Sequence, residues 1–338
     1  MNSQDVAYTK YGLVRDMLAA PELVAGFQAT VSKPLADRLA GVGRLLFTGE
    51  GSSRIFPSKQ AMMQARVRGD SCALHSEAGL QAGSYDLRQW AVLAVSNSGK
   101  TSEVVKLLQQ LQQAGHPHCY SLTAQANSKL ESLAHQGFVL TCGPEGAVAA
   151  TKSVIEQALF CQSLLEHLAN RVTSAATWQA VGAAMQTALT LPIAPVLVQR
   201  VAQAGTIYFA GPNDGVAEEL TLKTNEITRK SADYLEGTYA VHGIEEVMNP
   251  QDVVIWVAPP ADSEEKFQTV LEQGVGLQII AISDRPTRFP TLQVPASDMP
   301  GYVHMAAGWN LLVEVGIALG VDLDKPVRAR KVGNEFQG

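Results

Sequence analysis

Short runs of apolar residues recur along this chain, each followed by a small-residue turn and then by a longer stretch with helical spacing. The runs at residues 44–48 (RLLFT) and 90–95 (WAVLAV) have the length and character of strands buried on both faces. Strands that alternate with helices in this way are typical of βαβ units, whose strands are parallel. The pattern therefore predicts an α/β fold with mainly parallel sheets flanked by helices.

The same pattern occurs a second time, about 162 residues further on. Residues 206–210 (TIYFA) with Gly211 correspond to residues 45–48 with Gly49, and residues 253–257 (VVIWV) correspond to the strand that begins at Trp90. A repeat of this length indicates an internal duplication of one α/β domain. Further strands are predicted at residues 119–122, 138–141 and 278–283.

Helices are expected in residues 5–40, with breaks near Pro21 and Pro34, and also after Pro57, near Ala150 and after Val303. A length of 338 residues suits roughly two domains. We expect an N-terminal helical segment over residues 1–34, two similar domains over 35–172 and 173–321, and a polar tail over 322–338.

Charge and composition exclude several classes of protein. The chain has 26 basic and 32 acidic residues, a net charge of −6 and no basic run, which argues against nucleic-acid binding. We find neither a window near the ~18 apolar residues of a membrane helix nor an apolar signal core at the N-terminus. The expected location is the cytoplasm, without membrane association. The four cysteines form no CxxC pair or zinc-finger spacing, so we expect reduced thiols and no metal: Cys72, Cys119, Cys142 and Cys161.

The turn after the second predicted strand has the residues of an anion site. It reads Ser96-Asn97-Ser98-Gly99-Lys100-Thr101 and leads into a helix. Backbone N–H groups at a helix N-terminus suit a phosphate, and the hydroxyls add donors. The spacing is not that of a Walker A loop. An ordinary helix-capping turn explains the same residues equally well.

Two other turns of the first copy have a similar character. One contains Gly51, Ser52 and Ser53, and the other, residues 143–152, contains Val148 and Ala150. In the second copy, the turn equivalent to residues 96–101 carries two prolines and Asp262, which removes donors and repels phosphate. We therefore expect the first copy to bind phosphate, although a tight loop explains residues 143–152 as well.

The second copy carries charged groups instead. Lys223 and Glu226 are three residues apart and share a helix face. They could act as a base with a charge stabiliser, but a weak surface ion pair has the same spacing. His242 follows in a loop, where a histidine transfers protons or is merely solvated.

At this point the residues carry a resemblance to a known family. Residues 96–101 resemble the phosphate loop of sugar isomerase (SIS) domains. Residues 219–243 (ELTLKTNEITRKSADYLEGTYAVHG) resemble the isomerase half of glucosamine-6-phosphate synthases, and residues 326–331 resemble their catalytic tail. The resemblance covers the chain from about residue 40. It implies two tandem SIS domains with a C-terminal catalytic tail.

The resemblance also implies roles for particular residues. Glu226 matches the base that moves a proton between C1 and C2, and Lys223 matches a lysine near the enolate oxygen. His242 matches the ring-opening histidine, which in the family comes from the neighbouring subunit of a homodimer. Lys331 matches the tail lysine that reaches the sugar carbonyl.

The substrate contacts follow in the same way. Ser53, Ser96, Ser98 and Thr101 match phosphate and sugar contacts, and Asn97 stands where the family often has glutamine. Gly51, Ser52, Val148 and Ala150 belong to the same pocket by analogy. Two positions depart from the family: Ala150 replaces a serine, and Arg330 replaces a small residue.

A glutaminase domain with a terminal cysteine nucleophile is not part of the resemblance. We therefore expect an enzyme of the SIS-type glucosamine-6-phosphate deaminase kind, which releases ammonia and fructose 6-phosphate without a cofactor. A fructosamine-6-phosphate or fructoselysine-6-phosphate deglycase is the alternative enzyme. A non-catalytic sugar-phosphate sensor is the alternative of another class. The joint presence of Glu226, His242 and Lys331 favours an enzyme over such a sensor.

Overall fold

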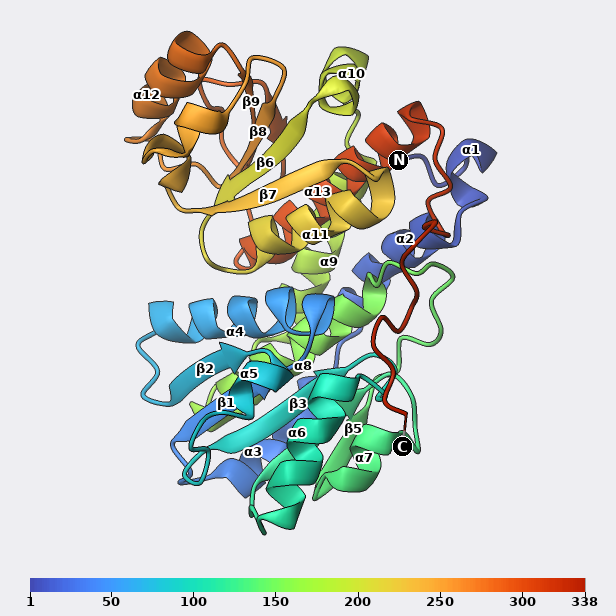
Figure 1. Ribbon diagram of the computed structural model, residues 1–338, viewed down its shortest axis with the longest axis vertical. Coiled ribbons are helices and arrows are strands. Elements are labelled where there is room, and N and C mark those ends of the chain that lie inside the picture. The colour runs from blue at the N-terminus through green and yellow to red at the C-terminus, as the bar shows by residue number, and fades with distance from the viewer. Residues whose placement is uncertain (338) are drawn as a thin grey trace. The chain divides into compact units, whose positions relative to one another are not determined.

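The computed structural model describes residues 1–337 and contains two five-stranded sheets whose strands pair in parallel (Figure 1). Internal contacts divide the chain into two compact units. The first-sheet unit comprises residues 26–145, 150–175 and 330–337, and the second-sheet unit comprises residues 1–25, 146–149 and 176–329. The predicted α/β fold with parallel sheets is confirmed.

The first sheet has the strand order β2-β1-β3-β4-β5. The bounds are β1 Arg44–Thr48, β2 Ala73–Glu77, β3 Ala91–Ser96, β4 Cys119–Thr123 and β5 Gln136–Val139. The chain leaves β1 toward β2 on one side, and β3, β4 and β5 follow on the other side. The order therefore reverses between β1 and β3, which is where ligands bind in open parallel sheets.

Both faces of this sheet are buried. The helices of the unit are η1 Ala29–Ser32, α3 Lys33–Leu39, η2 Gly51–Ser53, α4 Ile55–Val67, α5 Gly79–Ala82, α6 Ser102–Gln113, α7 Lys129–Leu133 and α8 Lys152–Leu168. On one face of the sheet Leu45, Phe47 and Leu93 pack against α3, α4 and α8, whereas Leu46 and Val92 point to the other face, against α5, α6 and α7. Burial on both faces explains why the inner strands read as continuous apolar runs.

The second sheet has the order β10-β9-β8-β6-β7, so its order also reverses, between β6 and β8. Its strands are β6 Thr206–Gly211, β7 Ser231–Glu236, β8 Val253–Val257, β9 Gln278–Ser283 and β10 Thr291–Gln293. The helices of the unit are α1 Val6–Thr9, α2 Gly12–Ala25, α9 Ala175–Thr190, α10 Pro195–Gln203, α11 Val216–Thr228, η3 Tyr239–Val241, η4 Ile244–Val247, α12 Glu264–Phe267, the π-helix η5 Gln268–Val275 and α13 Pro300–Ala318.

Close packing fixes helix α11 in the second-sheet unit. The helix begins after Gly215, whose φ of 89° is left-handed and therefore favours glycine. At Gly308 of α13, an added Cβ would lie 2.4 Å from the δ-carbons of Leu220. Because glycine has no side chain, Leu220 of α11 can pack directly on α13. Helix α11 is thus held against the core of its unit, and this placement sets the burial of its charged residues.

One expectation about the N-terminal helices is wrong. Pro21 does not break a helix, because it lies inside α2 and is buried there. The segment is held by packing within the second-sheet unit: an added Cβ on Gly182 of α9 would lie 2.5 Å from the Pro21 carbonyl oxygen. Pro34 does stand at a helix start, in the first turn of α3.

Two further findings concern the whole described chain. Within residues 1–337, no single helix has the length and apolar character of a membrane span, although the bent pair α9 and α10 meets that criterion when taken together. The four cysteines are free thiols: Cys72, Cys119, Cys142 and Cys161.

Candidate functional site

The loop of residues 96–101 lies at the carboxyl end of β3 and leads into α6, in the first-sheet unit. The hydroxyls of Ser96 and Thr101 are 2.9 Å apart, and Ser96 Oγ also accepts the Gly99 N–H at 3.0 Å. Gly99 has φ of 64°, and an added Cβ would lie 2.3 Å from Ser128 Cβ. Only glycine fits this turn, which presents hydroxyls at the N-terminus of a twelve-residue helix.

The turn after β1 lies at the same end of the sheet, beside the point where the strand order reverses. Residues Gly51–Ser53 form a short 3-10 turn. An added Cβ on Gly49 would lie 2.8 Å from the Val95 carbonyl oxygen, so the turn after β1 packs closely on the end of β3. The Ser53 hydroxyl accepts a long hydrogen bond, 3.5 Å, from the amide of Gln157. Both serine-bearing turns therefore meet at one place in the first-sheet unit.

Glu145, in the turn before α8, ties this region together. Its side chain is 2% exposed and accepts hydrogen bonds from Asn97 Nδ2 at 3.0 Å, from the Thr151 N–H at 2.7 Å and from the Ser153 hydroxyl at 2.9 Å. Burial by itself opposes ionisation. The neighbouring ammonium of Lys331 and these donors nevertheless hold the pKa of Glu145 below its ordinary value. The carboxylate is therefore ionised at neutral pH.

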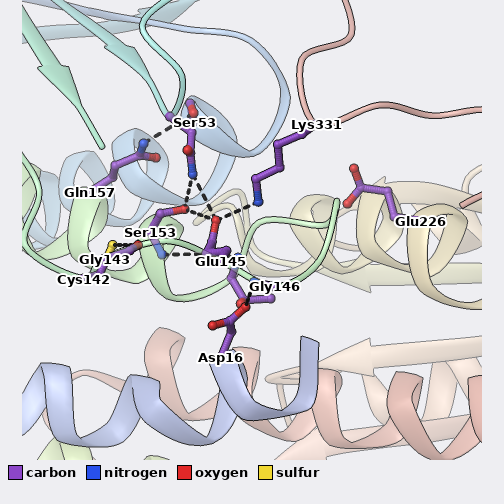
Figure 2. A network of polar contacts seen from close by, with 12 residues as sticks. Asp16, Ser53, Cys142, Gly143, Glu145, Gly146, Ser153, Gln157, Glu226 and Lys331 are labelled. Carbon is purple, nitrogen blue, oxygen red and sulfur yellow. Dashed lines mark hydrogen bonds and ion pairs between the residues drawn. The ribbon is translucent and has the colours of Figure 1, made fainter. Parts of the chain in front are cut away.

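Lys331 reaches this carboxylate from the tail. Its Nζ lies 2.9 Å from Glu145 Oε2, and both residues belong to the first-sheet unit. Figure 2 shows the Lys331 side chain pointing toward Glu145, with Ser153 beside the same carboxylate. The structure thus brings Lys331 to the network that also holds Asn97.

The second-sheet unit contains a buried cluster of charges on α11. Lys223 is fully buried, and its Nζ lies 2.7 Å from Glu226 Oε2 and 3.3 Å from Glu219 Oε1. Burial alone would lower the pKa of Lys223, but Glu226 and Glu219 outweigh it and raise the pKa above its ordinary value. The surface ion pair considered from the spacing is therefore wrong, because Lys223 is buried and only Glu226, at 23% exposed, reaches solvent.

This cluster has the composition of a proton-transfer site. Glu226 is a partly exposed carboxylate whose position is fixed by a buried ammonium, and Glu219 is a second, fully buried carboxylate beside the same ammonium. A carboxylate of this kind can accept a proton from carbon, and an ammonium beside it can stabilise a developing oxyanion.

His242 comes from a later segment of the second-sheet unit. It is exposed in the loop between η3 and η4, and its Nε2 lies 3.3 Å from the Thr238 hydroxyl. None of the contacts found for it in residues 1–337 involves Lys223 or Glu226.

The predicted site residues fall into two groups. The first-sheet unit holds Gly51, Ser52, Ser53, Ser96, Asn97, Ser98, Thr101, Ala150 and Lys331. The second-sheet unit holds Val148, Lys223, Glu226 and His242. Val148 donates its N–H to the Asp324 carbonyl within the latter unit. The roles of these residues stay predictions.

Sequence reasoning gave no site role to several residues that complete the two clusters: Glu145, Ser153, Gln157 and Glu219. The spacing of Glu219 to Lys223, i to i+4 on one helix, was a usable signal. The position of Glu145 before α8 was another, since a carboxylate near a helix N-terminus is stabilised there. Within residues 1–337, no group of three or more His, Cys, Asp or Glu side chains is arranged to hold a metal ion.

Comparison with known proteins places this geometry in context. Residues 38–167 match the family model of the SIS domain. The chain is 26% identical over 351 aligned positions to glutamine–fructose-6-phosphate aminotransferase [isomerizing] of Aeropyrum pernix, covering 93% of this chain and 55% of that protein. The same enzyme of Halobacterium salinarum is 26% identical over 222 positions, covering 60% and 37%. The chain thus spans about half or less of the curated relatives that it matches.

Solved structures share the fold. The C-terminal domain of glucosamine-fructose-6-phosphate aminotransferase from Francisella tularensis superposes with a TM-score of 0.77 at 17% identity, covering 94% of this chain and 98% of that one. A glucosamine-6-phosphate deaminase from Thermotoga maritima gives 0.72 at 15% identity, covering 95% and 99%. Residues 38–167 thus match the SIS domain, and the chain shares the fold of these solved structures.

The buried charge cluster leads to a stability prediction. Lys223→Met removes the ammonium that faces Glu219 in the core, and we expect a loss of about 3–5 kcal/mol in the free energy of unfolding, measured with urea. Lys223→Met combined with Glu219→Gln should recover part of that loss.

The exposed pair Lys33–Asp37 is the matched control, with side chains 56% and 63% exposed. Lys33→Met should change stability by less than about 0.5 kcal/mol. Equal effects of the two lysine substitutions would show that the α11 cluster is not a coupled buried unit.

Proposed function

We propose that the protein catalyses the isomerising deamination of glucosamine 6-phosphate to fructose 6-phosphate and ammonia. The observation that carries the proposal is the cluster on α11, where Glu226 is partly exposed and fixed 2.7 Å from the buried ammonium of Lys223. A base that must stay ionised and oriented benefits from an ammonium fixed beside it, and its partial exposure leaves it open to a substrate.

The chemistry requires only water as a co-substrate. In the open-chain amino sugar, Glu226 would remove the proton from C2 and return it to C1. The amine nitrogen loses one proton and the C1 oxygen gains one, so that a hydroxyl stands at C1 and an imine at C2. Lys223 would stabilise the oxygen at C1 while it carries negative charge. Addition of water to the imine then releases ammonia and leaves the ketose phosphate, so atoms and charges balance.

The first-sheet unit supports a phosphate on the same substrate. Residues 96–101 supply three hydroxyls and the start of α6 at the place where the strand order reverses. We assign the phosphate to Ser96, Ser98 and Thr101, and sugar contacts to Asn97, Ala150 and the turn of Gly51, Ser52 and Ser53. Val148, in the second-sheet unit, is assigned to the same pocket by resemblance.

The relatives support a reaction on phosphorylated amino sugars. The curated relatives are aminotransferases with an isomerising activity, and the Thermotoga maritima protein is described as a deaminase. These names concern those proteins, and they favour an amino-sugar phosphate for this chain. We also assign the sugar carbonyl to Lys331 and ring opening to His242 of a second copy in a homodimer.

The reaction is tested by ammonia release. Purified protein should release ammonia from glucosamine 6-phosphate, measured by a coupled dehydrogenase assay. Glu226→Gln should lower kcat by at least about 100-fold, because general base catalysis contributes about 10²–10⁴. Full activity of this variant would refute the role of Glu226.

The same assay separates the alternatives. Fructoselysine 6-phosphate is supplied in parallel, and release of lysine from it without ammonia from glucosamine 6-phosphate would replace the deaminase by a deglycase. Tight binding of a sugar phosphate with no turnover of either substrate would favour a sensor.

The phosphate assignment predicts a change in KM. Ser98→Ala with Thr101→Ala should raise KM for glucosamine 6-phosphate at least about tenfold, since hydrogen bonds to charged groups contribute about 1.5–3 kcal/mol each. The KM for unphosphorylated glucosamine should not change. An unaltered KM for the phosphorylated sugar would place the phosphate elsewhere.

The assignment of His242 to a second copy predicts complementation. Glu226→Gln and His242→Ala are each expected to be inactive. Mixed and allowed to exchange subunits, they should regain activity, because a heterodimer contains one site with both native groups. If the mixture stays as inactive as the separate variants, His242 does not act across subunits.

A further inference from the structure

The tail docks on the first-sheet unit at two places. Lys331 pairs with Glu145, as described above. A few residues later the chain runs antiparallel to the start of α6: the Ser102 N–H donates to the Asn334 carbonyl at 2.9 Å, and the Phe336 N–H donates to the Lys100 carbonyl at 2.8 Å. The tail therefore lies on the loop of residues 96–101 (Figure 1).

Side chains reinforce the second contact. Asn334 Nδ2 donates to Glu103 Oε1 at 2.8 Å, and Phe336 packs against the apolar cluster under α6 and α7. Glu335 Oε1 lies 3.1 Å from Lys100 Nζ, but both side chains are about half exposed, so this ion pair contributes little. Within the described residues these contacts of the tail are mostly single hydrogen bonds, whereas Lys331, at 34% exposed, pairs with a carboxylate that is only 2% exposed.

Glu145 connects three separate segments of the unit. Its carboxylate accepts hydrogen bonds from Asn97 in the loop after β3 and from Lys331 in the tail. It also accepts hydrogen bonds from Thr151 and Ser153 at the start of α8. Figure 2 shows Ser153 and Lys331 on two sides of the labelled Glu145. Helix capping would be satisfied by Thr151 and Ser153 alone, so the contacts to Asn97 and Lys331 call for another explanation.

Glu156 provides the contrast. It is also buried and also lies near the start of α8, where it accepts the N–H groups of Thr141 and Cys142 and the Thr141 hydroxyl. All of these donors come from the strand-to-helix connection. Glu156 therefore fixes that connection, and no contact found for it in residues 1–337 involves the tail.

We propose that Glu145 is a positioning residue that sets the place of Lys331 and of Asn97, and so holds the tail on the phosphate loop. It does not touch the reacting atoms, because its oxygens are occupied by Asn97, Thr151, Ser153 and Lys331. The docking of the tail is independent of any reaction, whereas the consequence for turnover rests on the proposed function.

The docking is tested by hydrogen exchange of the amides of Ser102 and Phe336, which bond across the tail contact. In Glu145→Gln, exchange at both amides should accelerate at least tenfold relative to the native protein. Lys331→Met, which keeps the carboxylate and its N–H donors, should accelerate them similarly. Glu156→Gln is the matched control and should leave them at the native rate.

The outcomes separate positioning from general destabilisation. Native protection in both Glu145→Gln and Lys331→Met would overturn the proposal, and so would equal acceleration in Glu156→Gln. If Glu145→Gln fails to fold, as judged by circular dichroism, Lys331→Met decides the result, and Glu145→Asp should restore part of the protection because it keeps the charge.

Steady-state kinetics of the same variants give a second test of the proposal. In a double-mutant cycle, Glu145→Gln should lower kcat in the native background but have less than a twofold further effect on kcat in Lys331→Met, because it acts through that lysine. Glu145→Gln should also raise KM, because Glu145 positions Asn97, which is assigned to sugar contacts. Additive effects on kcat would overturn the positioning role. Absence of turnover in the native protein would refute the proposed function and leave the exchange result to decide the docking.

Discussion

Parallel pairing of the strands is the constraint on which the rest of the structure depends. Parallel neighbours cannot be joined by tight turns, so each connection crosses a face of the sheet, mostly as a helix. The crossings bury both faces and bring the loops at the carboxyl ends of the strands to one edge. The serine turns after β1 and β3, and the start of α11 after β6, are consequences of this single arrangement.

The inner strands could be predicted from the sequence because they are buried on both sides. Predicted and observed bounds agree at Arg44–Thr48, Val253–Val257 and Gln278–Ser283. Three strands were missed, namely β2, β7 and β10, and each lies at the edge of its sheet. Edge strands have a partner on one side and more polar, partly exposed residues, as in Ser231–Glu236 (SADYLE), so no apolar run marks them.

The candidate site could be predicted only in part, for a similar reason. Residues 96–101 stand out because adjacent residues form the turn. The ion pair of Lys223 was visible in the spacing, but its burial was not, because burial depends on α13 and on the absent side chain of Gly308. The contact of Glu145 with Lys331 joins residues 186 positions apart, and no local pattern reports such a pair.

The second-sheet unit is built from segments that lie far apart in the sequence, and this has a consequence for folding during synthesis. Residues 1–25 belong with residues 176–329, and α2 carries buried apolar side chains such as Leu13 and Met17. During synthesis on the ribosome this helix emerges more than a hundred residues before residues 176–329, with which it packs. The first-sheet unit can collapse in the interval, while α2 keeps an apolar face open to chaperones. A gene fragment cut between the two sheets would leave α2 in that unfinished state.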